Sequence, residues 1–298
     1  MSLRELLLNI YDKQYKKLMM FSFLLLLACI VSLGVGYSRT GEFFQKGVSL
    51  KGGITMTVPV GASFDIHRLE RDLSGRFPNA DIGVREITEG GVSTAIIVEA
   101  SDVSPEELEA ALPVFGVQLN PGAYSIESMG SSLGQRFFSQ TVRALIYAFI
   151  FMAIVVFLTF RSVIPSSFVI LAAVSDIIST LAVVNLLGIK MGTAGIAALL
   201  MLIGYSVDTD ILLTTKVLKR KGEGGTVFQR TVGAFRTGVT MTATALTAAL
   251  IGLFFTQSDT IRQIMLITTI GLLFDMVYTW FQNAGILRWY MERKHGQS

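Results

Sequence analysis

Long apolar blocks alternate with short polar stretches along most of this chain of 298 residues. A helix rises about 1.5 Å per residue, so about 20 apolar residues cross a hydrocarbon core about 30 Å thick. Six blocks have about this length, and we expect each of them to form a transmembrane helix. The six predicted spans cover residues 18–36, 144–160, 166–187, 193–215, 238–255 and 264–285.

Residues 37–138, between the first two blocks, follow the shorter periods of a soluble domain. Apolar residues alternate from Ile54 to Val58, as in a strand, and then recur at helical spacing as far as Phe77-Pro78. Two further alternating stretches flank Glu89-Gly90-Gly91, which predicts a β-hairpin.

A second helix and a last strand complete this predicted domain. Ser104 and Glu107 have the spacing of a capping box, with Pro105 at the first helical position, and a strand is expected near residues 124–128. The order strand-helix-strand-strand-helix-strand is the split ferredoxin-like arrangement. We therefore predict a membrane bundle of six transmembrane α-helices, with an α+β ferredoxin-like extracytoplasmic domain between helices 1 and 2.

The first residues of the chain leave two alternatives open. Apolar residues recur at helical spacing among charges in residues 1–17, so this segment either lies as an amphipathic helix on the membrane surface or extends the first transmembrane helix. The predicted division of the chain is a cytoplasmic amphipathic N-terminus (1–17), transmembrane helix 1 (18–36), the extracytoplasmic domain (37–138), transmembrane helices 2–6 (139–285) and a cytoplasmic tail (286–298).

Basic residues are distributed unequally between the two sides of the predicted bundle. If the N-terminus is cytoplasmic, fourteen of them fall in inner segments and two, Lys190 and Arg262, in short outer loops. By the positive-inside rule we expect a multi-pass cell-membrane protein with both termini in the cytoplasm. The fourteen inner residues are Arg4, Lys13, Lys16, Lys17, Arg161, Lys216, Lys219, Arg220, Lys221, Arg230, Arg236, Arg288, Arg293 and Lys294.

The composition agrees with a membrane location and narrows the classes of function. Charged residues make up 16% of the chain, against about 25% in soluble domains, and apolar residues make up 51%. The net charge of +3 is not gathered into a basic patch with interleaved aromatics, so we expect no nucleic-acid partner. The single cysteine, Cys29, excludes a disulfide framework and a Cys-based metal site.

No pattern in the sequence predicts an enzyme or a cofactor site. His67 is the only histidine in residues 37–138, and without a partner at ligand spacing it is expected on a helix surface. Lys51-Gly52-Gly53 lacks the rest of the phosphate-loop pattern G-x-x-x-x-G-K-[ST]. With no nucleophile-base arrangement either, we expect a non-enzyme without metal, nucleotide or covalent cofactor.

Four aspartates inside the apolar blocks are the strongest candidates for a functional site: Asp176, Asp208, Asp210 and Asp275. Each opposes membrane insertion by about 2.5 to 3.5 kcal/mol, so its presence requires a compensating role. Either they bind protons, or they are hydrogen-bonded to Ser, Thr and Asn neighbours and only brace the helices. Asp208 and Asp210 lie about 200° apart around a helix, and Ser206 shares a face with Asp210.

The fifth block offers a polar helix face that complements these acids. Arg236 stands at its predicted cytoplasmic end, where it either snorkels to the membrane interface or pairs with an aspartate of the fourth block. An aspartate whose arginine partner comes and goes is a candidate proton-binding site. Four threonines recur three and four residues apart along the same block: Thr237, Thr240, Thr244 and Thr247.

These segments together resemble the SecD/SecF family of protein-export membrane proteins, within the resistance-nodulation-division superfamily. Lys51-Gly52-Gly53 is similar to the element that opens the external domain of SecF. The run Gly204-Tyr205-Ser206-Val207-Asp208-Thr209-Asp210 resembles the family's fourth-segment signature, Phe235-Arg236-Thr237 its arginine motif, and Ser175-Asp176-Ile177 the His-Asp-Val of the third segment. The resemblance covers essentially the whole chain, and Trp280-Phe281-Gln282-Asn283 suggests the separate-chain, archaeal style.

The chain departs from the family pattern at its acids. Many bacterial relatives read Asn-Asp-Thr where this chain has Asp208-Thr209-Asp210, whereas SecD commonly reads Val-Asp-Ala-Asn, which Val207-Asp208 resembles. On this resemblance Asp208 is the first candidate for a proton carrier, and Asp210 is an accessory or alternative.

The resemblance implies an accessory subunit of the Sec protein-export machinery. Such a subunit acts with SecD and the Sec translocon, among membrane lipids, to assist unfolded exported polypeptides on the outer side, and proton flow through the bundle drives it. Two alternatives stay open: a proton-coupled small-molecule exporter of the resistance-nodulation-division type, and a scaffold whose acids only brace helices. An exporter normally has larger external domains and a second homologous half.

Overall fold

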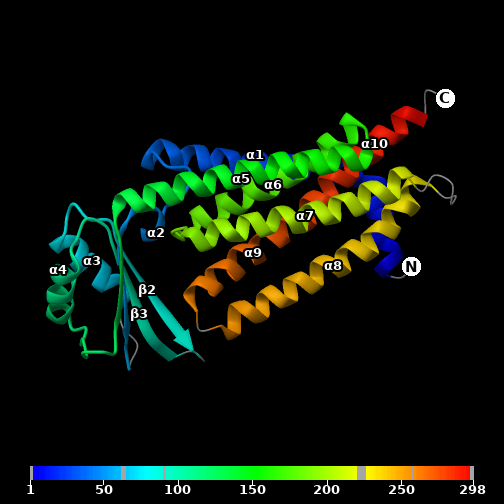
Figure 1. The fold of residues 1–298 in the computed structure, drawn as a ribbon. Helices are drawn as coiled ribbons and strands as arrows, with labels where there is room; N and C mark the ends of the chain where they lie inside the picture. The colour runs from blue at the N-terminus through cyan, green and yellow to red at the C-terminus, as the bar shows by residue number, and fades with distance from the viewer. Residues whose placement is uncertain (1–2, 62–64, 90–91, 220–225, 257, 296–298) are drawn as a thin grey trace. The chain divides into compact units, whose positions relative to one another are not determined.

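The computed structural model describes residues 3–61, 65–89, 92–219, 226–256 and 258–295. The chain forms two compact units, whose helices and strands are drawn in Figure 1. The first, which we call the helical unit, comprises Met1–Gln45, Arg143–Lys190 and Ala194–Ser298. The second, the sheet unit, comprises Lys46–Val142 and Met191–Thr193.

Six helical segments of the described chain are long and apolar enough to cross a membrane, as predicted. The last of them runs through two helices that a π-helical turn, Tyr278–Asn283, joins. The helices are α1 (Leu3–Thr40), α5 (Ser131–Phe160), α6 (Val163–Leu186), α7 (Thr193–Lys219), α8 (Val227–Phe255), α9 (Asp259–Val277) and α10 (Ala284–His295).

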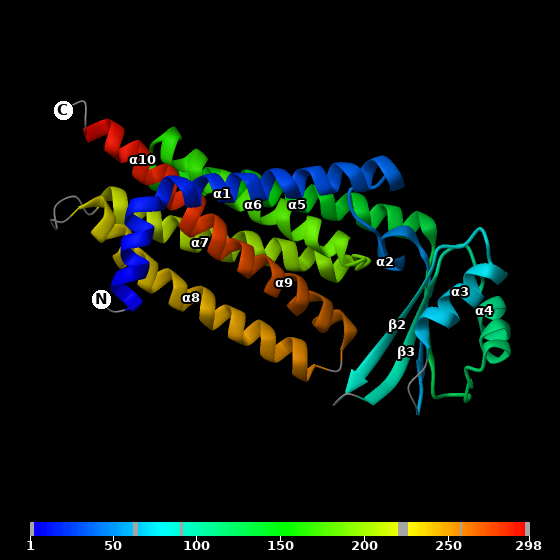
Figure 2. The same cartoon turned by 180° about the vertical axis from the view of Figure 1, so that it is seen from behind.

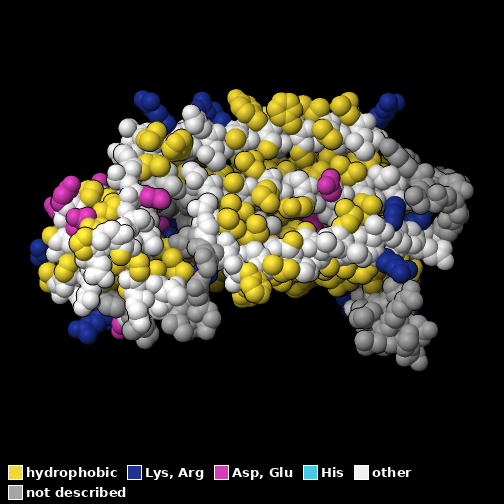
Figure 3. Space-filling model, turned by 60° about the horizontal axis from the view of Figure 1, so that its bottom comes forward, with side chains coloured by type: hydrophobic (Ala, Val, Ile, Leu, Met, Phe, Trp, Pro, Cys, Tyr) yellow, Lys and Arg dark blue, Asp and Glu magenta, His cyan; other side chains and the backbone are white. Residues whose placement is uncertain are grey.

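Burial separates the helices of the helical unit into inner and outer ones. In the most apolar window of α6 and of α7, 56% of the residues are buried, whereas the corresponding share is 11% in α5 and 17% in α8. Figure 3 shows apolar side chains over much of the visible face of this unit. α6, α7 and the last span, which is 50% buried, therefore form the interior of the unit, and apolar faces of α1, α5 and α8 are left for lipid or a partner.

Two helices begin well before the apolar blocks that predicted them. α5 starts at Ser131 and α8 at Val227, whereas the blocks start near residues 144 and 238. Hydropathy locates only the part of a helix that suits hydrocarbon, and polar turns can continue it. In α8 a capping box sets the start, because Gln229 donates its N–H to Thr226 at 3.3 Å and its side chain accepts the Thr226 N–H at 3.1 Å.

The N-terminal segment continues as helix and changes direction. α1 is helical from Leu3 but bends at Gln14, where φ is −116° and ψ is 16°. Figure 2 shows this bend near the N-terminus. Just beside it, Asp12 forms a salt bridge with Arg288 at 2.7 Å, which holds the start of α1 against α10.

The sheet unit contains one antiparallel sheet of four strands, in the order β2-β3-β1-β4. The helices α3 (Ile66–Arg76) and α4 (Pro105–Ala111) lie on one side of the sheet (Figure 2). Along the chain the order is β1 (Gly53–Pro59), α3 (Ile66–Arg76), β2 (Ile82–Glu89), β3 (Val92–Ala100), α4 (Pro105–Ala111) and β4 (Ser125–Met129), which is the order that the periodicity predicts. A short helix α2 (Val48–Lys51) precedes β1, and the glycines of the predicted hairpin turn, Gly90 and Gly91, lie outside the described residues.

The core of the sheet unit comes from alternate residues of the strands. In β1, Met56 is fully buried and pairs with Val98 of β3 and with Ile126 of β4. Leu73 of α3 and Leu108 of α4 cover the same face and are also fully buried. This period of two gives each strand one core-facing side, which explains why strand positions could be predicted.

Replacing Ser104 by alanine is expected to destabilise α4 by about 1 kcal/mol. The Ser104 hydroxyl accepts the Glu107 N–H at 3.2 Å, and the Glu107 carboxylate accepts the Ser104 N–H at 2.9 Å, so the variant loses one half of a capping box. Hydrogen exchange of the α4 amides in the full chain should become about fivefold faster. Ser125→Ala, on an exposed strand position, is the control, and equal exchange in the Ser104 variant and the unmodified chain would contradict this role.

Candidate functional site

Three of the four membrane aspartates meet in the interior of the helical unit. Asp176 of α6, Asp210 of α7 and Asp275 of α9 are each 0% exposed. Asp275 interacts electrostatically with both of the others. Within the part of the chain that the structure describes, no lysine or arginine forms a salt bridge with any of the three. We call these residues the acid cluster.

Hydroxyl groups from three helices surround the carboxyl group of Asp275. Thr209 of α7 and Thr242 of α8 donate to Oδ2 at 3.3 and 3.4 Å. Thr279, one turn further along, donates to Oδ1 at 3.0 Å. Both oxygens of this carboxyl therefore accept hydrogen bonds from side chains.

The other two acids each keep one oxygen free of described partners. Ser206 donates to Oδ2 of Asp176, and Asn283 donates to Oδ1 of Asp210 at 2.7 Å. Asp176 Oδ1 and Asp210 Oδ2 are buried and make no hydrogen bond with any described residue. A carboxyl group in this position can carry a proton on the oxygen that accepts no bond, and three neighbouring buried carboxylates without a cation would be very costly if all were charged.

The π-helical turn Tyr278–Asn283 supplies much of the wall around the acid cluster. Besides Asn283, it places Gln282 within 3.2 Å of Ser175 on α6, to which Gln282 donates, and Tyr278 within 2.6 Å of Ser179. Trp280 packs against Gly238 of α8, where a side chain would overlap the indole ring. Single π turns inside α-helices occur frequently at functional sites because they widen the helix locally.

Asp208 points away from the acid cluster and is exposed. It lines a surface groove of about 470 Å³ between α7, α8 and α9, together with Thr240 and Thr244. The sequence predicted that Asp208 and Asp210 face different neighbours, and the structure places Asp210 in the interior and Asp208 in this groove.

The predicted threonine face of α8 also lies at the surface. Thr240, Thr244 and Thr247 donate to carbonyl groups of their own helix at 2.8 Å, and Thr237 accepts from Lys216 at 2.8 Å. Arg236 is exposed and forms no ion pair with any described residue. The structure thus separates Arg236 and the threonine face from the acid cluster.

Several residues around the acid cluster were not predicted as site residues from the sequence. Five polar residues contact the acids or their neighbours: Thr209, Thr242, Thr279, Gln282 and Asn283. Three of them stand in the motifs of the family resemblance without an assigned role, and Thr242 and Thr279 were not singled out. A usable signal was present, because Thr279 and Asn283 follow Asp275 at intervals of four residues.

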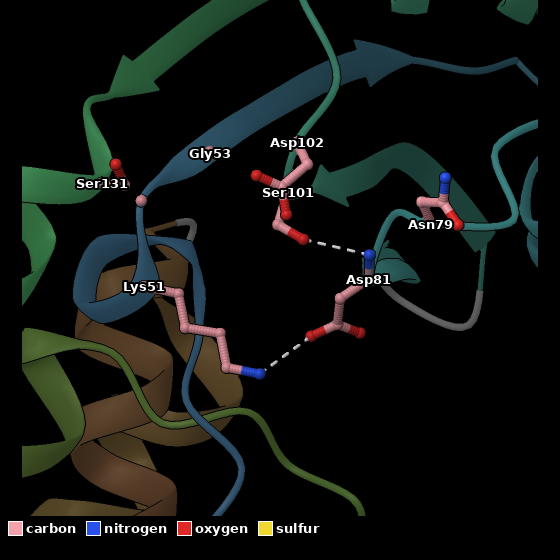
Figure 4. A pocket seen from close by; sticks show the side chains of 8 residues that line it. Lys51, Gly53, Asn79, Asp81, Ser101, Asp102 and Ser131 are labelled. Atoms are coloured by element: carbon pink, nitrogen blue, oxygen red, sulfur yellow. Dashed lines mark hydrogen bonds and ion pairs between the residues drawn. The ribbon is translucent and has the colours of Figure 1, made fainter.

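The Lys51-Gly52-Gly53 element lines a polar pocket of about 440 Å³ in the sheet unit, shown in Figure 4. Lys51 and Asp81 point toward each other and form a salt bridge at 3.2 Å, and Ser101 accepts the Asp81 N–H at 3.0 Å. Gly52 has φ +90°, and a β-carbon there would lie 2.4 Å from the α-carbon of Ser131. The absence of a side chain at these glycines therefore allows β1 to approach the start of α5 closely.

A family model described as "Protein export membrane protein SecD/SecF, C-terminal" matches residues 113–293 of this chain. The matched part contains α5 to α9, and thus the whole acid cluster.

Curated relatives match along nearly the full length. The protein-export membrane protein SecF of Methanocaldococcus jannaschii is 38% identical over 290 residues, which are 94% of this chain and 96% of that protein. SecF of Pyrococcus furiosus is 34% identical over 296 residues, covering 99% and 97%. Among solved structures, the crystal structure of SecDF, a translocon-associated membrane protein from Thermus thermophilus, has a similar fold with a TM-score of 0.76 at 18% identity. That match covers 94% of this chain and 38% of the SecDF chain.

Proposed function

This chain belongs to the SecF family of protein-export membrane proteins, and from that premise we propose that it is a non-enzymatic accessory subunit of the Sec export machinery. In this proposal it works beside a SecD protein and the Sec translocon and assists unfolded polypeptides on the outer side of the cell membrane. The support for the partner is the SecDF fold, in which a chain like this one accounts for 38% of the length.

In this proposal a flow of protons through the helical unit supplies the energy for export. The observation that supports it is the acid cluster. Asp176, Asp210 and Asp275 are buried and have no basic partner among the described residues, so their charge is most easily changed by binding and releasing a proton. Each proton that moves inward across 100 mV of membrane potential yields about 2.3 kcal/mol. The geometry makes Asp210 our first candidate for the carrier, with Asp176 and Asp275 as its neighbours in the relay.

Asp208, Arg236 and the threonine face of α8 have a different proposed role. They are exposed in this chain, and an aspartate and an arginine facing hydrocarbon would each cost about 2.5 to 3.5 kcal/mol. We therefore assign this groove to the contact with the helices of SecD, where Arg236 can approach an acid of either chain.

The sheet unit is the proposed contact with the exported polypeptide. Its strand order β2-β3-β1-β4, with two helices on one face, supports a ferredoxin-like classification. The fourteen-to-two bias of basic residues supports cytoplasmic termini and an outer position for this domain.

A photo-crosslinking experiment tests the proposal against a small-molecule exporter. A crosslinker at Val114, which is 71% exposed on the sheet unit, should capture a secreted polypeptide stalled during export, and SecD should copurify with the chain. The control places the crosslinker at Phe254 of α8, which is 73% exposed on an apolar helix surface. A role in export would be excluded if the polypeptide is captured at neither position and if secretion is unaffected when the chain is depleted.

A further inference from the structure

An apolar groove of about 500 Å³ runs between α1, α6 and α10 on the surface of the helical unit. One of its lining residues, Ser167, is polar, and its hydroxyl already donates to the Ile164 carbonyl at 2.7 Å. The apolar lining residues are Met19, Phe23, Phe168, Leu171, Ile286 and Trp289.

A glycine fixes how closely the walls of this groove approach each other. Gly285 of α10 faces Met19 of α1, and a β-carbon at position 285 would lie 2.9 Å from the Met19 β-carbon. The two helices therefore approach each other closely at Gly285 and Met19, and Met19 also lines the groove.

α1 and α10 each carry a basic residue on the face that lines the groove. Lys16 precedes Met19 and Phe23 by three and seven residues, so the three share one face of α1. Arg293 follows Trp289 by four residues and shares its face of α10, and its guanidinium lies 4.3 Å from the centre of the Trp289 ring.

The two cations stand at the same end of the groove. Tyr15, next to Lys16, donates a hydrogen bond to Glu292, which is next to Arg293. The two nearby acids, Asp12 and Glu292, form salt bridges with Arg288 at 2.7 and 2.9 Å. Lys16 and Arg293 are exposed and form no salt bridge with any residue that the structure describes.

We infer that this groove is a binding site for an anionic phospholipid, with one acyl chain along its apolar lining residues and the phosphate at Lys16 and Arg293. The site has two matching parts: an apolar groove that accepts a hydrocarbon chain, and two exposed cations without a salt bridge to any described residue, which accept a phosphate. An exposed tryptophan beside the cations is typical of the depth at which lipid headgroups begin. This site lies on other helices than the groove of Asp208, so it does not depend on the proposed contact with SecD.

Spin-labelled lipids test the inference on the purified full chain. In nanodiscs of phosphatidylcholine, labelled phosphatidylglycerol should show a motionally restricted component that labelled phosphatidylcholine lacks. The double variant Lys16→Gln and Arg293→Gln should weaken this preference about 30-fold, because two surface cations are lost. Arg39→Gln with Arg262→Gln is the matched control, since it removes the same charge near the opposite helix ends and should leave the preference unchanged.

A second variant separates the acyl-chain site from a general attraction of charges. Ser167→Trp fills the groove and leaves both cations, so it should remove the restricted component although the surface charge is unchanged. The inference is overturned if both charge variants weaken lipid binding equally, or if the tryptophan has no effect. It is also overturned if a crosslinker at Phe23 captures a protein in the membrane rather than lipid.

Discussion

Replacing Asp210 by asparagine should abolish proton-driven support of export, while the chain still folds and inserts. Asparagine has nearly the same shape, and its carbonyl can still accept the 2.7 Å hydrogen bond from Asn283, but it cannot bind and release a proton. Because one proton crossing 100 mV supplies about 2.3 kcal/mol, we expect secretion of a dependent protein to slow by at least about tenfold. The measurement is the rate of secretion in cells whose own copy of the chain has been replaced by the variant.

Asp208→Asn is the matched control for this experiment, because it makes the same chemical change two residues away on the exposed side of α7. Secretion should be reduced less in this variant than in Asp210→Asn, and any loss should follow reduced copurification of SecD. Normal secretion with Asp210→Asn would exclude Asp210 as the carrier. Full loss with Asp208→Asn while SecD stays bound would make the groove rather than the interior the site of proton binding.

Replacing Gly52 by alanine should destabilise the sheet unit by about 3 kcal/mol or more. The backbone at Gly52 has φ +90°, which side chains disfavour, and the added β-carbon would meet the α-carbon and nitrogen of Ser131 at 2.4 and 2.6 Å. Both neighbours are backbone atoms, so they cannot turn aside as a flexible side chain would. The change should appear as faster hydrogen exchange across β1 and β4 in the full chain.

Gly61→Ala provides the comparison, because Gly61 has no heavy atom within 4 Å of the position of the added β-carbon. That variant should exchange as slowly as the unmodified chain. If Gly52→Ala is equally harmless, the Lys51-Gly52-Gly53 element is not held to glycine by the approach to α5, and its role must lie in the pocket beside Lys51 and Asp81.

Period and hydropathy account for most of the fold. Alternation in β1 and the capping residues of α4 concern neighbours in sequence, so strands and helices of the sheet unit could be placed without knowledge of the rest. The start of α5 could not be placed in this way. Residues 131–142 are too polar for hydropathy to assign them to a span, yet they are helical, and Gly134 in their first turn packs on the backbone at Gly52.

The candidate site was only partly predictable, for a geometric reason. The sequence singled out the four aspartates by their cost in a membrane, and it separated Asp208 from Asp210 by helical geometry. Which of the two faces inward depends on where α6 and α9 lie, and no local pattern contains that information. Thr279 and Asn283 follow Asp275 at intervals of four residues, but their contacts with Asp275 and Asp210 also depend on the π turn and on the position of α7, which the spacing does not contain.

The π-helical turn Tyr278–Asn283 also preserves the rotational phase between α9 and α10. Its hydrogen bonds span five residues instead of four, so the turn accommodates one residue more than the length of the helix requires. Losing one residue there would let the turn relax into α-helix while α9 and α10 keep nearly the same relative phase, so the change would be local and would move Asn283 relative to Asp210. An alignment of related chains should therefore show a one-residue gap at this point wherever the partner of Asp210 has been lost.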